Sequence, residues 1–108
     1  MDILEFKISA FSWGVHRKEC YSINLKTKAC AHTENNRHIR NRVLSKEEFE
    51  RVLDFVNRFV KEPILDSFGF DAPIFEMLLD GKAIARGIAV NDANKTYSMI
   101  NDFFKSLI

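Results

Sequence analysis

Residues 44–49 (Leu-Ser-Lys-Glu-Glu-Phe) contain a complete helix start, which limits the possible folds more than any other part of the sequence. Ser45 can serve as the N-cap, because its hydroxyl can accept a hydrogen bond from the amide of Glu48 while the Glu48 carboxylate accepts one from the amide of Ser45. Leu44 and Phe49 occupy the two positions of a hydrophobic staple. We therefore expect a helix to begin at Ser45.

Apolar side chains follow this start with the spacing of one helix face. The stripe consists of Phe49, Val52, Leu53, Val56 and Val60, and it is widened by Phe55 and Phe59. Pro63 cannot donate a helical hydrogen bond and disfavours helical geometry at Glu62, so the helix should end near Lys61. The pattern predicts a helix that is deeply buried on one side.

The residues before this helix alternate with the period of half-buried strands. One run covers residues 3–11 and a second covers residues 20–25, and residues 29–32 are a plausible short third strand. We predict an antiparallel meander of two or three strands with one face on the core. Residues 34–42 are polar and are expected to form a solvated, partly flexible loop.

The second half of the chain predicts a hairpin and a terminal helix. Asp80-Gly81 is a preferred pair for a type I′ turn, so residues 74–79 and 82–90 should pair with Met77 opposite Ile84 and Glu76 opposite Ala85. Residues 64–73 read as an irregular connection. The apolar face of the terminal helix would consist of Tyr97, Ile100, Phe104 and Leu107, reinforced by Met99 and Phe103.

These elements predict one α+β domain over residues 1–108. It should be a two-layer fold of the order ββ(β)-α-ββ-α, with an antiparallel sheet and two helices packed on one face. With 108 residues, of which 46% are hydrophobic, the chain can form one real core. The sequence has no basic start followed by a long apolar run, so we expect neither a secretory signal nor a membrane helix. A soluble cytoplasmic protein with reduced Cys20 and Cys30 is the default expectation.

No catalytic, cofactor or metal motif of useful specificity occurs in the sequence. Cys20, Cys30, His32 and His38 lack the short paired spacing of a zinc site. There is no strand-Gly-x-Ser-x-Gly-helix element and no glycine-rich phosphate loop. We therefore expect a protein that is not an enzyme and that carries neither a cofactor nor a metal.

Two kinds of surface could bind a protein partner. The segment from Glu47 to Asp80 contains nine acids and three bases, and aromatic residues occur in two loops. The candidate partner-binding residues are Trp13, Glu47, Glu50, Asp54, Asp66, Phe68, Phe70, Asp71 and Asp80. A solvated surface is the alternative explanation, because Arg51 and Arg58 follow Glu47 and Asp54 by four residues and favour surface ion pairs.

A basic cluster favours a different function from protein binding. Arg37, Arg40 and Arg42 could contact phosphates in a small nucleic-acid-binding or regulatory module. The cluster matches no nucleic-acid-binding motif, and the chain has a formal net charge of only +1. Nucleic acid is therefore the second choice of partner.

The element order, with the capped helix at residues 44–48 and the Asp-Gly hairpin at residues 80–81, resembles small bacterial immunity proteins. In particular, the chain looks like the cytoplasmic partners that neutralise toxins of contact-dependent growth inhibition systems. This resemblance rests on size and element order, and it implies a single-domain, non-catalytic protein that covers the active site of a cognate toxin. If that toxin is a nuclease, its basic cleft would favour the acidic residues.

Overall fold

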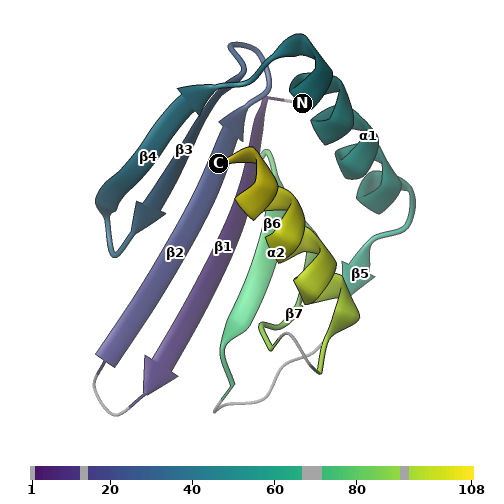
Figure 1. Ribbon diagram of the computed structural model, residues 1–108. Coiled ribbons are helices and arrows are strands. Elements are labelled where there is room, and N and C mark those ends of the chain that lie inside the picture. Colours follow the sequence, from purple (N-terminus) through teal and green to yellow (C-terminus); the bar gives the residue numbers. More distant parts are fainter. Residues whose placement is uncertain (1, 13–14, 67–71, 91–92) are drawn as a thin grey trace.

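The computed structural model describes all residues except 1, 13–14, 67–71 and 91–92 (Figure 1). Over the described residues it contains a seven-stranded sheet of order β4-β3-β2-β1-β6-β7-β5. All neighbouring strands are antiparallel except β5 and β7, which are parallel. The elements are β1 (Ile3–Ser12), β2 (Val15–Asn24), β3 (Ala29–Glu34), β4 (Arg37–Val43), α1 (Lys46–Lys61), β5 (Ile64–Leu65), β6 (Ile74–Leu79), β7 (Lys82–Ile88) and α2 (Lys95–Leu107).

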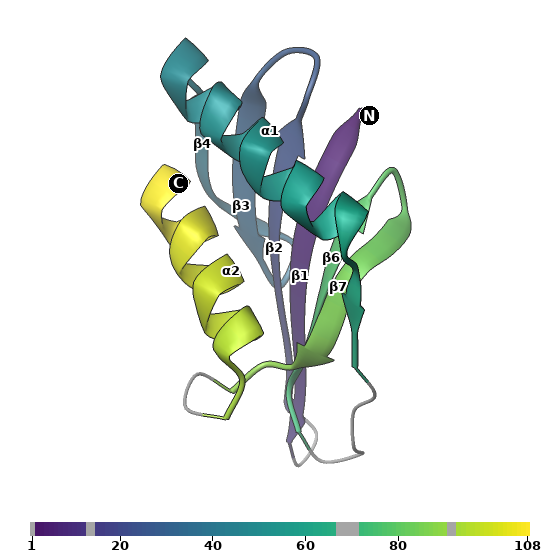
Figure 2. The ribbon, with the colours of Figure 1, turned by 90° about the vertical axis from the view of Figure 1, so that its right-hand side faces the viewer.

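The sheet and the helices form two layers. Both helices lie on one face of the sheet, and no described element covers the opposite face (Figures 1 and 2). The helices contact each other through Phe55 of α1 and Phe103 of α2, whose rings stack with centroids 3.9 Å apart. The predicted two-layer α+β fold with both helices on one face is therefore confirmed.

The core lies between the layers and is rich in aromatic rings. Phe6 of β1 is fully buried at its centre, and four other rings have centroids within 6.3 Å of the Phe6 ring: those of Tyr21, Phe75, Tyr97 and Phe104. Directly paired residues share one face of a sheet, so the pairing of Phe6 with Tyr21 and Met77 puts alternate residues of β2 and β6 on the same core face. The alternation predicted for the first two strands is confirmed at Leu4, Phe6, Tyr21 and Ile23, which are all buried.

The start of α1 forms as predicted. The Ser45 hydroxyl accepts from the Glu48 amide at 3.2 Å, and the Glu48 carboxylate accepts from the Ser45 amide at 3.0 Å. The helix ends at Lys61, but its buried stripe is narrower than expected. Val60 is 46% exposed, and the buried residues of this helix are Val52, Phe55, Val56 and Phe59.

Removing the N-cap tests this helix start. We expect Ser45→Ala to lower the free energy of unfolding by about 1 kcal/mol, because the Glu48 amide loses its acceptor. Urea unfolding of both proteins measures the difference. An unchanged midpoint with an unchanged slope would contradict a stabilising cap at Ser45.

The segment expected to be a polar loop is instead a strand, so that prediction was wrong. Residues Arg37–Val43 pair with β3 and form one edge of the sheet. The turn before them contains Asn35 and Asn36 with φ angles of +51° and +65°, a conformation that Asn adopts more readily than most residues. Polar residues dominate this strand because neither helix covers it, so the apolar alternation that identifies a half-buried strand is absent (Figure 1).

The hairpin of β6 and β7 also departs from the predicted register. Asp80 and Gly81 have φ angles of +51° and +82°, as the expected type I′ turn requires. A bulge between Met77 and Leu78 then shifts the pairing, so that Met77 lies opposite Ala85 and Glu76 lies opposite Arg86. Ile84 is the extra residue, which allows the consecutive Ile84 and Ala85 side chains both to be buried.

Two further findings concern the connection after α1 and the helices. The predicted irregular connection begins with the two-residue strand β5, which pairs with β7. Neither α1 nor α2, the helices found in the described parts of the chain, has the length and apolar character needed to cross a membrane.

Candidate functional site

The charged side chain of Glu19 on β2 has three side-chain partners among the described residues. It shares the helix-side face of the sheet with Tyr21, two residues further along the same strand. The Tyr21 hydroxyl donates to Glu19 Oε1 at 3.2 Å, and Nε2 of His32 lies 3.0 Å from the same oxygen. Since a carboxylate only accepts, Nε2 carries a proton. Arg17 Nη2 lies 3.6 Å from the other oxygen, Oε2.

Ring stacking and burial fix the positions of the Glu19, Tyr21 and His32 side chains. The rings of Tyr21 and His32 are nearly parallel, with centroids 4.1 Å apart. The side chains of Glu19 and His32 are only 13% and 16% exposed. Burial and then the negative charge of Glu19 raise the pKa of Tyr21, so its hydroxyl stays protonated and remains a donor. Arg17 also pairs with Glu34 at 3.6 Å and thereby links β2 to β3.

A pocket of about 310 Å³ lies beside this group, between the sheet and α2. Its polar lining consists of Arg17, Glu19, Tyr97, Asn101 and Lys105. Asn101 is 3% exposed, and its Oδ1 atom has no hydrogen-bond partner among the described residues. Buried polar atoms are almost always satisfied by protein, water or ligand, so the side chain of Asn101 marks this pocket as a candidate binding site.

Neither Glu19 nor Asn101 was identified from the sequence, although both break an apolar pattern. Glu19 continues the alternation of Tyr21 and Ile23 on the core face of β2. Asn101 occupies a core position of α2, between buried Tyr97 and Phe104. A polar residue in a buried stripe is the signal that could have indicated this site.

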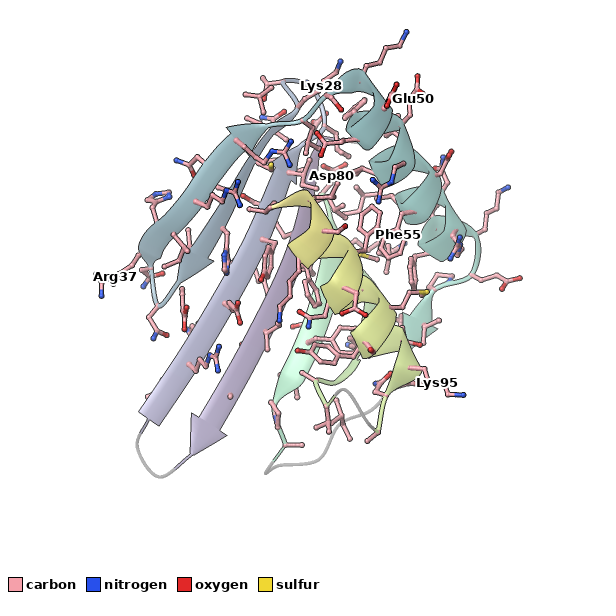
Figure 3. All side chains as sticks on the ribbon, viewed as in Figure 1. Lys28, Arg37, Glu50, Phe55, Asp80 and Lys95 are labelled. Carbon is pink, nitrogen blue, oxygen red and sulfur yellow. The ribbon has the colours of Figure 1, made fainter. Side chains whose placement is uncertain are left out.

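The predicted acidic stretch does not form one acidic surface. Glu47, Glu50 and Asp54 are exposed on α1, and Figure 3 shows Glu50 on the outer side of that helix. The remaining charges of the exposed α1 surface are basic at Lys46, Arg51, Arg58 and Lys61 and acidic at Glu62. Glu48 is paired with Arg42 at 2.7 Å, and Asp66 is exposed after β5. The surface of α1 is therefore close to neutral.

The expected ion pairs along α1 are also missing. Within the described parts of the chain, Glu47 forms no pair with Arg51, and Asp54 forms none with Arg58. Arg58 Nη1 instead lies 3.9 Å from the sulfur of Met99 on α2. The exposed acids of α1 thus remain open to a partner.

Asp80 has a structural role that the sequence did not predict. Its Oδ1 atom accepts from the backbone amides of Asp2 and Ile3 at 2.8 and 2.9 Å, which ties the start of β1 to the turn between β6 and β7. These two donors lower the pKa of Asp80 below its ordinary value of 3.8.

This contact predicts a specific pH dependence. Because the pKa of Asp80 is lower in the folded state, its charge stabilises the fold above about pH 4, and this contribution is lost as the pH falls through the folded pKa. Asp80→Asn keeps an Asx-Gly turn but removes the charge. We expect the wild-type protein to have the higher urea midpoint near neutral pH and the two midpoints to converge in acid. A constant difference between about pH 6 and pH 2 would contradict this assignment.

Two arginines of the basic cluster are engaged within the fold. Arg40 Nη1 donates to the main-chain oxygen of Ile108 at 2.6 Å, and Arg42 donates to that of Leu107 and to Glu48. They bind main-chain oxygens at the C-terminal end of α2, where a helix favours positive charge. Arg37 is exposed at the tip of the β3–β4 hairpin (Figure 3). The three arginines therefore do not form a common free surface for phosphates.

The cysteines lie on neighbouring strands, as predicted, but on opposite faces. Cys30 pairs with Ile23 on the core face, and its thiol lies 3.3 Å from the Arg42 carbonyl oxygen. Burial raises the pKa of both thiols, so neither is an activated nucleophile. Both are free, and the described residues contain no group of three side chains suited to a metal ion.

Four other predicted binding residues, Trp13, Phe68, Phe70 and Asp71, lie outside the described residues.

The uncovered face of the sheet carries a shallow groove of about 520 Å³ across β1 to β4. Its apolar lining includes Ile3, Ala31 and Val43, and polar groups come from Ser22, Asn24, Asn41 and Arg42. Ile3 is 45% exposed and Val43 is 66% exposed. An aliphatic recess on a solvent-facing sheet was not predicted from the sequence.

Comparisons with protein-family models, with curated proteins and with solved structures find no match to this chain.

Proposed function

We propose that this chain is a non-catalytic protein-binding domain that acts as an immunity protein and neutralises a cognate bacterial toxin by covering the toxin's active site. The observation that carries the proposal is the aliphatic groove on the uncovered sheet face. The resemblance in size and element order to immunity proteins supplies the class of partner.

The groove has the composition of a protein-binding surface. The solvent-facing side of an antiparallel sheet is normally polar, whereas this groove exposes Ile3 and Val43. Exposed apolar patches with polar rims are typical of protein–protein interfaces. A sheet held on its other face by a packed aromatic core is also rigid, so little conformational entropy is lost when a partner binds.

A growth experiment tests the proposed function directly. The toxin domain encoded by the neighbouring reading frame is induced in a susceptible bacterium with and without this chain. We expect this chain to restore growth and to form a stable complex with the toxin domain in size-exclusion chromatography. Growth arrest that persists while both proteins are soluble, or a neighbouring frame that encodes no toxin, would contradict the proposal.

Charge substitutions on two surfaces identify the docking face. Val43→Lys places a charge at the groove, where a bound partner would bury it without a counter-ion, so we expect at least about a tenfold loss of affinity. Glu50→Lys on the outer side of α1 is the matched control. It should change mainly the association rate and its salt dependence, because exposed charges act chiefly on encounter.

The opposite ranking would support a different docking surface. If Glu50→Lys and Asp54→Lys abolish binding while Val43→Lys does not, the acidic residues of α1 form the interface, as expected for a toxin with a basic cleft. Binding kinetics at two salt concentrations separate the two cases.

A further inference from the structure

Beyond a role in protein binding, we propose that the pocket between β1, β2 and α2 is a binding site for a small carboxylate with a short apolar tail. The pocket is on the helix side of the sheet, opposite the aliphatic groove. Its volume of about 310 Å³ lies near the lower end of the size range of small-molecule sites.

Three unpartnered polar side chains of α2 face this pocket at four-residue intervals. Tyr97, Asn101 and Lys105 therefore lie on one side of the helix, and all three line the pocket. Among the described residues, the Tyr97 hydroxyl, the Asn101 Oδ1 atom and the Lys105 ammonium group have no hydrogen-bond partner. The carboxamide of Asn101 can rotate to offer its amino group. Asn101 lies about 6 Å along the helix axis from each of the other two, so it can donate to a small acceptor together with Lys105 or Tyr97.

The charges of the pocket favour an anion over a cation. Arg17 and Lys105 contribute two positive charges to its lining, and Glu19 contributes one negative charge. Both oxygens of Glu19 are already engaged, Oε1 by Tyr21 and His32 and Oε2 by Arg17. Lys105 is exposed and forms no ion pair with a described residue, so its charge is available to a carboxylate.

The remaining lining is apolar and fits a short hydrocarbon tail. Ile8 and Ala10 from β1 and Pro73 and Ala89 from the β6–β7 segment complete the pocket. A ligand with a carboxylate head and two to four carbons would place its charge at Lys105 and its tail between these residues. The same chemistry occurs in a free short-chain acid and in the C-terminal residue of a peptide.

Three probes of similar length but different charge test the proposal on the intact chain by NMR titration: butyrate, butyramide and butylammonium. We expect saturable shifts of the Tyr97 and Asn101 signals with butyrate, with a dissociation constant on the order of millimolar. The neutral and cationic probes should cause no saturable shift. Acetyl-Gly-Val with a free carboxylate, compared with its amide, distinguishes the sources. Tighter binding of this peptide than of butyrate would identify a peptide end as the natural ligand.

Substitutions on α2 test the site independently of the probe. Lys105→Gln should weaken butyrate binding at least about threefold. Lys95→Gln, at the other end of the same helix, is the matched control and should leave binding unchanged (Figure 3). Asn101→Leu should abolish binding and raise the urea midpoint, because it removes an unsatisfied buried group.

Several results would overturn the proposal. Equal binding of the three probes, no saturable butyrate shift up to about 50 mM, or butyrate binding that survives Asn101→Leu would each do so. The pocket would then hold water only. These titrations need no toxin, so their failure and a failure of growth rescue are separate results.

Discussion

Phe6→Ala should lower the free energy of unfolding by about 3–5 kcal/mol, a larger effect than that of Ser45→Ala or Glu19→Ala. Phe6 is fully buried, and its ring lies between the sheet and α2. Removing it leaves a cavity that neighbouring rings cannot fill, because Tyr21 and Phe104 are themselves held by packing. Small domains are stable by about 5–15 kcal/mol, so this variant should be close to unfolding at room temperature.

Urea unfolding followed by circular dichroism measures this effect. Val60→Ala is the matched control, because it also truncates an apolar residue but one that is 46% exposed on α1. We expect the control to change stability by no more than about 0.5 kcal/mol. If Phe6→Ala and Val60→Ala gave equal losses, the aromatic core would not be the main source of stability.

The elements that could be predicted from the sequence are those whose signals are local. The reciprocal cap of Ser45 and Glu48 depends on residues three positions apart, and the Asp80-Gly81 turn depends on adjacent residues. The alternation around Phe6 reports directly which face of β1 is buried. Each of these local elements forms as predicted because the tertiary packing favours the same conformation.

The elements that were predicted wrongly depend on contacts across the fold. β4 is a strand only because β3 provides its hydrogen-bonding partner, and its polar residues are tolerated at an edge that no helix covers. Val60 has the right spacing for burial, but it is 46% exposed, whereas Val56 and Phe59 of the same helix are buried. The bulge at Met77 inserts Ile84 into the core, and a two-residue turn alone cannot predict such a shift.

The candidate sites also depend on contacts between residues that are distant in the sequence. The acidic residues are close together in sequence, but the fold places Glu48 against Arg42 and uses Asp80 to hold the backbone of β1. Glu19 on β2 contacts His32 on β3. The pocket beside them is also lined by side chains of α2, which are about 80 residues from Glu19 in the sequence. Residues that are so far apart in the chain could be joined only once the strand order and register were known.

Glu19→Ala should lower the free energy of unfolding by about 2 kcal/mol. Its carboxylate is the shared acceptor of Tyr21, His32 and Arg17, so truncation leaves these donors without their partner in a partly buried site. Hydrogen bonds to a charged group contribute more than neutral ones, but water can reach the open side of the pocket and limits the loss.

Two variants separate the charge of Glu19 from its shape. Glu19→Gln keeps an acceptor oxygen, so we expect a smaller loss, about 1 kcal/mol. Glu34→Ala removes the other acid beside Arg17, but this side chain is 38% exposed, so we expect a change of no more than about 0.5 kcal/mol. Urea midpoints give the ranking, and the NMR signal of the His32 ring reports whether Nε2 keeps its proton. Equal stability of Glu19→Ala and the wild-type protein would show that the Tyr21–His32 stack holds the site without the carboxylate.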